Sequence, residues 1–152
     1  MKLLSFQPFS IYDCGGGCRI LRRLYAGHEE DIISLAVADA PLTQNGELIS
    51  ELVILATPIR RHWYRSYLRG LMDWTRERVF GPLTAGRIQR AARSLSGDVM
   101  HSVAHGPFSA SLIKDKSLGR REHWVSFHDH HETSGLERSD AARLWAEANS
   151  VS

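Results

Sequence analysis

The chain has 152 residues, a formal net charge of +2, 43% hydrophobic and 24% charged residues. This length suits one domain with a buried core, and the charge balance excludes a polycation. No stretch approaches the roughly 20 apolar residues of a membrane span, and residues 1–6 are too short for a secretory signal. Cys14 and Cys18 have Cys-x3-Cys spacing, which fits neither a redox nor a zinc motif. We therefore expect a cytoplasmic protein with two free thiols.

The first half of the chain alternates between strand and helix signals. Residues 2–6 form a short apolar strand, and the three glycines at 15–17 precede a helical periodicity over residues 18–26. Gly27 ends that helix. Aliphatic runs over residues 31–37 and 50–56 predict two further strands, which a polar stretch with an Asn45-Gly46 turn separates.

The second half continues the alternation. Residues 60–80 predict a long helix that Gly81-Pro82 ends, and Thr84 is expected to cap a helix that runs to about residue 95. Strands over residues 98–104 and 123–127 flank a helix at 108–116. Ser139 caps a last helix to about residue 148, and residues 150–152 begin a sixth strand.

This order predicts an α/β fold, with a Rossmann-like, mostly parallel sheet, helices on both faces and a single domain over residues 1–152. Right-handed crossovers favour the strand order 3-2-1-4-5, with the domain truncated before or at the sixth strand. Ligands of such sheets bind beyond the carboxyl ends of the strands, where the strand order reverses. That point lies between the first and fourth strands.

Three segments are expected to converge at this edge of the sheet. Tyr12, Asp13 and the glycines follow the first strand, His105 follows the fourth, and the fifth is followed by His128, Asp129, His130 and His131. Gly15, Gly16 and Gly17 open a helix, where free amides and the helix dipole favour an anion such as phosphate. A plain tight turn explains the same glycines, because a lone glycine run is a weak signal.

The histidine run supplies groups for acid–base work. His128 comes directly after a buried-looking strand, which favours a functional role, whereas His130 and His131 also fit a solvated loop. His128-x-His130 could seed a metal site, and this supports the alternative of a small metal-dependent hydrolase. His101 and His105 are four residues apart on a strand, roughly 13 Å, and are too distant to share an ion. We assign no metal ligands in the preferred interpretation.

Residues 60–93 carry nine arginines against two acids. On a helical wheel, Arg61, Arg65, Arg69 and Arg76 share one face, and an aromatic and aliphatic face lies opposite, formed by Trp63, Tyr67, Leu71 and Trp74. The commoner arrangement packs the aromatic face on the sheet and leaves the arginines in solvent. The alternative is contact with anionic lipid or another anion, which makes a non-catalytic binding module a further hypothesis. No recognised nucleic-acid-binding module accompanies the basic stripe, so we expect no nucleic-acid partner.

Taken together, the Asp13-Cys14-Gly15-Gly16-Gly17 loop, the DVMHSVAHGP segment, the strand ending WVSFHDH and the tail SDAARLWAEANSVS resemble a known family. They look like the amino-terminal, acceptor-binding domain of GT-B type retaining glycosyltransferases of group 1, family 4. The resemblance covers nearly the whole chain. It implies a hexosyltransferase that uses a nucleotide sugar as co-substrate, without another cofactor.

The resemblance also assigns roles to residues. It implies that Gly15, Gly16 and Gly17 lie near the donor phosphates, that His128 and Asp129 serve the reaction centre, and that Tyr12, Asp13, His105 and His130 contact the acceptor. The basic helix implies peripheral docking at the inner face of a membrane. The acceptor is expected to be a sugar or a lipid-linked sugar.

One departure from the family is large. Its carboxyl-terminal domain holds most of the donor through two glutamates eight positions apart, and no two glutamates of this chain have that spacing. The resemblance therefore implies a fragment, a degenerate reading frame or one subunit of a split enzyme, with a second subunit supplying the missing domain. We expect the chain to be inactive alone.

Overall fold

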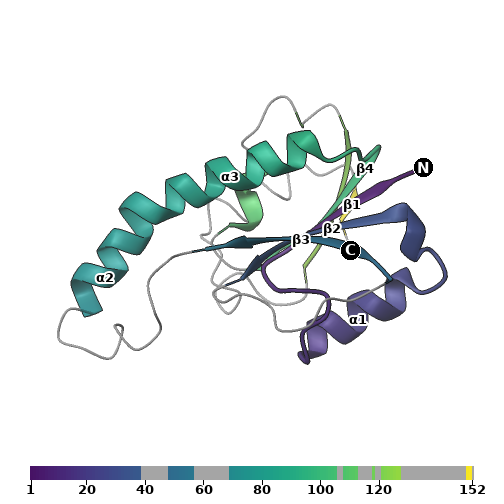
Figure 1. The fold of residues 1–152 in the computed structure, drawn as a ribbon, viewed down its shortest axis with the longest axis horizontal. Helices are drawn as coiled ribbons and strands as arrows, with labels where there is room; N and C mark the ends of the chain where they lie inside the picture. Colours follow the sequence, from purple (N-terminus) through teal and green to yellow (C-terminus); the bar gives the residue numbers. More distant parts are fainter. Residues whose placement is uncertain are drawn as a thin grey trace.

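The computed structural model describes residues 1–38, 48–56, 69–105, 108–112, 118, 121–127 and 150–151. These residues form a parallel sheet with helices on both faces (Figure 1), which confirms the α/β class. Helix α1 (Gly16–Tyr25) covers one face, and α2 (Arg69–Thr75) and α3 (Gly81–Ser94) lie on the other side.

Six strands make up the sheet in the order β3-β2-β1-β4-β5-β6, and every described pair is parallel. Their bounds are β1 (Leu3–Gln7), β2 (Ile32–Ala38), β3 (Ser50–Leu55), β4 (Val99–Val103), β5 (Glu122–Ser126) and β6 (Ser150–Val151). The predicted order 3-2-1-4-5, with a sixth strand beginning at the end of the sequence, is confirmed. The order reverses between β1 and β4, because β1 pairs with both β2 and β4.

The main apolar core lies between the sheet and α3. Alternate residues of the strands point to it, and they pack against Ile88 and Ala92 of α3. The core members from the strands are Leu4, Phe6, Leu35, Val37, Ile54 and Met100. This face is where burial of apolar area contributes most to folding.

The face under α1 differs, because polar side chains form a row across it. Ser5 of β1 pairs in register with Ser34 of β2 and with His101 of β4, and Ser34 pairs with Glu51 of β3. Ser5 and Ser34 are fully buried, and His101 is almost so. Burial of so many polar groups is tolerated only where they hydrogen-bond to one another.

Close packing also fixes where β4 begins. A Cβ on Gly97 would lie 2.8 Å from the Leu4 Cβ and 3.2 Å from the Leu4 backbone nitrogen. The next residue, Asp98, accepts a hydrogen bond from the Lys2 backbone N–H at 2.9 Å. The absence of a side chain at position 97 therefore lets the chain enter β4 directly beside β1.

The long helix does not end at Gly81-Pro82, so that part of the prediction is wrong. A π-helical segment, η3 (Arg76–Phe80), joins α2 to α3 without a break, and the three form one rod whose α2 end extends beyond the sheet (Figure 1). Pro82 has no N–H and would clash with the carbonyl four residues earlier in a regular helix. The wider π turn immediately before it changes that geometry, so the chain continues as a helix.

Two further details differ from the predictions. Thr84 lies inside α3 instead of capping it, and its hydroxyl donates to the Ala56 carbonyl at 2.7 Å, which ties α3 to the end of β3. In the segment expected as a helix over 108–116, the described part contains a short 3-10 turn, η4 (Ser109–Ser111). Gly27 ends α1 with a φ of 86°, as expected.

Several expectations lie outside the described residues. They are the Asn45-Gly46 turn, the first part of the basic helix and the helix capped by Ser139. Within the described ranges, no helix has the length and apolar character needed to cross a bilayer.

Candidate functional site

The strand order reverses between β1 and β4. These strands are neighbours, and they pair from Leu3↔Val99 to Phe6↔Ser102. The segments that follow β1 and β4 therefore leave the sheet side by side, at the carboxyl-terminal end of the strands. This arrangement defines a doubly wound α/β domain, a class in which ligands generally bind at this point of the sheet.

The loop after β1 begins at the carboxyl-terminal end of the sheet and returns along the face that α1 covers. The Ile11 N–H donates to the Glu51 carboxylate of β3 at 2.9 Å, and the Ser10 hydroxyl donates to the same carboxylate. The Tyr12 hydroxyl donates to the Ile49 carbonyl at 2.9 Å and accepts from the Ile49 N–H at 2.7 Å. Because Ile49 immediately precedes β3, Tyr12 anchors the loop near the start of that strand. The sequence predicted that Tyr12 contacts the sugar acceptor, and it did not predict this structural role.

The glycine turn opens α1 as predicted. Gly15 is the N-cap residue with extended backbone (φ −69°, ψ 164°), and no described side chain caps the helix start. The three glycines have different surroundings. A Cβ on Gly17 would lie 2.9 Å from the Phe9 ring, whereas a Cβ on Gly16 would meet no atom within 4 Å. Packing therefore explains Gly17, and Gly16 has open space beside it.

Other candidate residues are distributed between described and undescribed parts of the chain. Asp13 is exposed, and its backbone N–H donates to the Ser10 carbonyl at 3.1 Å. His105 is the second residue after β4 and is partly exposed. His128, Asp129 and His130 lie outside the described residues, so their approach to the glycine turn stays a prediction.

The basic helix is described from Arg69 onward. Arg61 and Arg65 lie outside this range, and for Arg69 and Arg76 only the helical backbone is described. Leu71 is 54% exposed and Trp74 is 56% exposed. The expected packing of these two side chains on the sheet is therefore wrong, because this part of the helix extends beyond it (Figure 1).

A chain of hydrogen bonds crosses the α1 face and was not anticipated. It starts at Ser126, whose hydroxyl oxygen is 2.9 Å from His101 Nε2, and His101 Nδ1 is 2.6 Å from the Tyr25 hydroxyl oxygen. We call this the hydrogen-bond chain; its full membership is Ser126, His101, Tyr25, Ser5, Gln7, Ser34 and Glu51.

The remaining links have short, regular distances. Tyr25 and Ser5 oxygens are 2.7 Å apart, Ser5 donates to the Gln7 carbonyl oxygen at 2.7 Å, and the Gln7 amide donates to Ser34 at 2.6 Å. Ser34 donates to Glu51 at 2.7 Å. The sequence did contain a signal for this hydrogen-bond chain. Polar residues occur at alternate positions of otherwise apolar strands, and alternate residues of a strand lie on the same face of the sheet.

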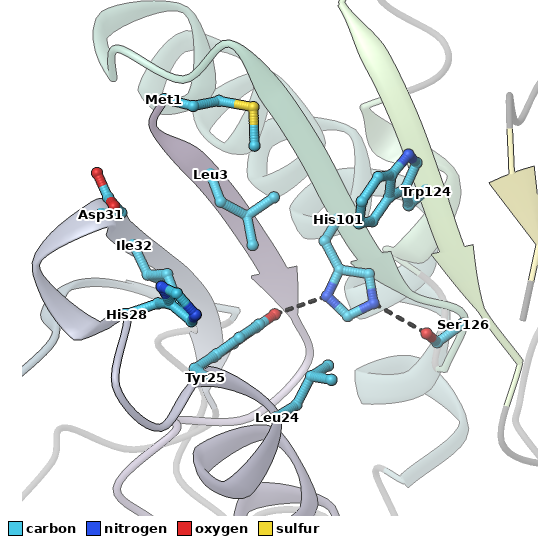
Figure 2. Close-up of a pocket in the computed structure, with 10 residues that line it drawn as sticks. All are labelled: Met1, Leu3, Leu24, Tyr25, His28, Asp31, Ile32, His101, Trp124 and Ser126. Carbon is cyan, nitrogen blue, oxygen red and sulfur yellow. Dashed lines mark hydrogen bonds between the residues drawn. The ribbon is translucent and has the colours of Figure 1, made fainter.

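One end of the hydrogen-bond chain opens into a cavity of about 540 Å³ beside α1 (Figure 2). Tyr25, His101 and Ser126 lie in a line across it, joined by the two hydrogen bonds drawn there. Apolar side chains from four elements surround them, namely Leu3 of β1, Leu24 of α1, Ile32 of β2 and Trp124 of β5.

Burial changes the titration of two groups near these features. It raises the pKa of the Tyr25 hydroxyl to about 12, because the phenolate would lose its hydration, and the hydrogen bond with Ser5 opposes this only in part. Burial likewise raises the pKa of the Cys18 thiol. Cys14 and Cys18 are both free cysteines, as predicted, and the raised pKa makes Cys18 a poor nucleophile.

Near the cavity, the chain carries acidic residues in the 3-10 turn η1 (Glu29–Asp31). The Gly27 N–H donates to the Glu29 carboxylate at 3.0 Å and lowers the pKa of that carboxyl. In the described part of the chain, no three histidine, cysteine or acidic side chains come together as a metal site would require.

Comparison with known proteins adds no family to this description. The sequence matches no protein-family model, and no curated protein is similar to it.

Proposed function

We propose that this domain is the acceptor-binding half of an enzyme that transfers a sugar from a nucleotide sugar. The observation that carries the proposal is the strand order, which reverses between β1 and β4 in a doubly wound sheet. The glycine turn that opens α1 and His105 after β4 follow the two strands that flank this reversal. On the proposal, Asp13, His105 and His130 contact the acceptor, and His128 and Asp129 serve the reaction centre.

The start of α1 is the part of the proposed site that meets the donor phosphates. The first N–H groups of a helix have no partner within it, and they carry the positive end of the helix dipole. No described side chain caps the first turn of α1, and that turn contains no acidic residue. These properties favour a bound phosphate group at Gly16 and Gly17.

Two substitutions at one position test the phosphate contact. Gly16→Pro removes one amide donor but suits the first helical position, and the extended backbone of Gly15 is compatible with a following proline. Gly16→Ala is the matched control, because it keeps the N–H and its Cβ has open space. A hydrogen bond to a charged group contributes about 1.5–3 kcal/mol. The proline variant should therefore bind inorganic pyrophosphate and UDP-glucose at least about tenfold more weakly than the alanine variant.

The same titration tests whether the glycine turn and His105 lie at one ligand site. Amide chemical shifts of Gly16, Gly17 and His105 are followed by NMR while UDP-glucose is added. Joint shifts at all three, with weaker binding by Gly16→Pro, support the proposal. A response of the glycines alone would refute the shared site, and no response would refute the donor contact. Sugar transfer itself is expected only with a domain that supplies the paired glutamates of the family.

A second proposal concerns the membrane. We infer that the α2 region rests on an anionic bilayer at the cytoplasmic face, because Leu71 and Trp74 are exposed there among arginines. The double variant L71S/W74S should lose most sedimentation with anionic vesicles while its urea midpoint stays unchanged, since neither side chain is buried. The wild type should not sediment with neutral vesicles. Equal binding to both vesicle types, or unchanged binding of the variant, would remove this proposal.

A further inference from the structure

The α1 face of the sheet is open over β5. Within the described residues, α1 is the one α-helix on this face, whereas α2 and α3 lie on the other side (Figure 1). Parallel sheets ordinarily bury both faces under helices. On β5, alternation and register direct Glu122, Trp124 and Ser126 to the α1 face, and Trp124 is 43% exposed there. A large aromatic side chain of the sheet is therefore left partly uncovered.

An apolar groove lies between α1 and β5. It is the cavity of about 540 Å³ in Figure 2, where Leu24 of α1 forms one wall, Trp124 of β5 forms the other, and Leu3 of β1 lies between them. Leu24 is 61% exposed, and Ile20, four residues earlier in α1, is exposed as well. Because residues four apart share one face of a helix, the apolar wall continues along α1 from Leu24 to Ile20.

The space beside α1 has the width of one helix. Tyr25 of α1 is bonded to Ser5 of β1, which places α1 over that strand. Neighbouring strands lie about 4.8 Å apart, so β5, two strands further, lies roughly 10 Å away. Packed helices lie roughly 8–10 Å apart, and a helix with its side chains is roughly 10–12 Å wide. A second helix beside α1 would therefore lie over β4 and β5 and cover Trp124.

Carboxylates flank the groove on two sides. Asp31 lines it and belongs to η1, whose three residues are all acidic. Glu122 lies on the other side, where it accepts a hydrogen bond of 2.8 Å from Trp124 Nε1. The lining residues also include His28, with its imidazole, and Met1, with the amino group of the chain start. The carboxyl-terminal end of α1, which carries negative partial charge, is beside the groove too. The balance of charge favours a cationic partner.

We propose that this groove is a docking site for an amphipathic helix of a partner protein, with lysine or arginine on both sides of its apolar stripe. The stripe covers Leu24 and Trp124, and the flanking cations approach Asp31 and Glu122. Such helix-in-groove binding uses apolar anchors at positions i, i+3, i+4 and i+7 of the bound helix. The groove extends to the first residue of β1, Leu3, so it lies away from the carboxyl end of the sheet and does not depend on the proposed sugar transfer.

Three synthetic peptides of about 14 residues, roughly four helical turns, test the chemistry of the partner. The first is an amphipathic helix of leucine and lysine, and the second has glutamate in place of lysine. The third has the composition of the first in an order that forms no apolar stripe. Binding is followed by NMR at the indole N–H of Trp124. The leucine–lysine helix should shift this signal and bind about tenfold or more tightly than the other two.

Matched variants locate the contact. Leu24→Ser removes one apolar wall and should weaken binding of the leucine–lysine helix about fivefold or more. Leu83→Ser is the control, because Leu83 is a leucine of α3 with nearly the same exposure, 60%, on the other side of the sheet. It should leave the affinity unchanged. Urea midpoints confirm that both variants fold, as the exposure of both leucines leads us to expect.

A charge variant separates electrostatic from apolar binding. D31N/E122Q removes both flanking charges and keeps an oxygen that can accept from Trp124 Nε1. In low salt it should weaken binding of the leucine–lysine helix about threefold or more and reduce the salt dependence of that binding.

Sedimentation equilibrium without peptide examines the other occupant, a second copy of this chain. A wild type that dimerises through the groove, with Leu24→Ser monomeric, would overturn the proposal of a partner helix. So would a Trp124 signal that no peptide shifts, or that the glutamate or reordered peptide shifts as strongly as the leucine–lysine helix. An equal loss of affinity in Leu24→Ser and Leu83→Ser, or an unchanged affinity in D31N/E122Q, would also overturn it.

Discussion

Tyr25 lies at the centre of the hydrogen-bond chain, and its replacement by phenylalanine should produce a stability difference that depends on pH. The hydroxyl is bonded to Ser5 at 2.7 Å and to His101 at 2.6 Å in a buried setting. Tyr25→Phe keeps the ring and removes both bonds. These two bonds are lost inside a buried region, so the variant should be about 1–3 kcal/mol less stable near pH 7.

The difference should shrink in alkaline solution. Above an ordinary tyrosine pKa of 10, the unfolded chain releases a proton that folded Tyr25 retains until its pKa of about 12. The unfolded state binds fewer protons in this window, so the free energy of unfolding of the wild type falls as the pH rises. A separation of two pKa units corresponds to about 2.7 kcal/mol, comparable with the hydrogen bonds that the variant lacks.

Urea denaturation followed by circular dichroism at pH 7, 9, 10, 11 and 12 measures both free energies. The wild type should be the more stable protein at pH 7, and the two curves should approach each other between pH 10 and pH 12. All other tyrosines titrate in both proteins and cancel in the comparison. A difference that stays constant across this range, or a variant as stable as the wild type at pH 7, would refute the reasoning.

Three other substitutions test packing and one hydrogen bond on the opposite face of the sheet. Gly97→Ala should cost about 1–3 kcal/mol, since its Cβ would lie 2.8 Å from Leu4. Gly86 lies inside α3 with open space for a Cβ, so Gly86→Ala should instead raise the free energy of unfolding by about 0.5–1 kcal/mol. Urea midpoints that shift in the same direction for both variants would contradict these expectations. Thr84→Val should cost about 1–3 kcal/mol by leaving a carbonyl at the end of β3 without its donor, and unchanged amide hydrogen exchange in α3 would argue against that role.

The fold was predictable from the sequence to a large extent, because alternation and crossover handedness leave few topologies. The strand order needed only five aliphatic runs, the helical signals between them and the right-handed rule. The junction at Pro82 was not predictable in this way. Local signals favour a helix end there, and the continuation depends on a π turn that the sequence pattern does not specify.

The candidate site was predictable in position more than in detail. The reversal between β1 and β4 follows from topology, but the return of the loop after β1 depends on Glu51, a residue 40 positions beyond Ile11. The hydrogen-bond chain was not predicted either, because it also depends on contacts between residues that are far apart in the sequence. Its members come from six separate segments, and only the register of the strands brings Ser5, Ser34 and His101 into one row.

The π turn between α2 and α3 has a consequence for how this protein can vary. Such a turn holds one residue more than an α-helical turn, and each residue of a helix turns the chain by about 100°. Deletion of a single residue within η3 (Arg76–Phe80) would convert it to a regular α-helical turn, which completes the same rotation with one residue fewer. The side of the rod that shows Leu71 and Trp74 would then keep its direction, whereas deletion of one residue from α3 would rotate that side by about 100° around the axis.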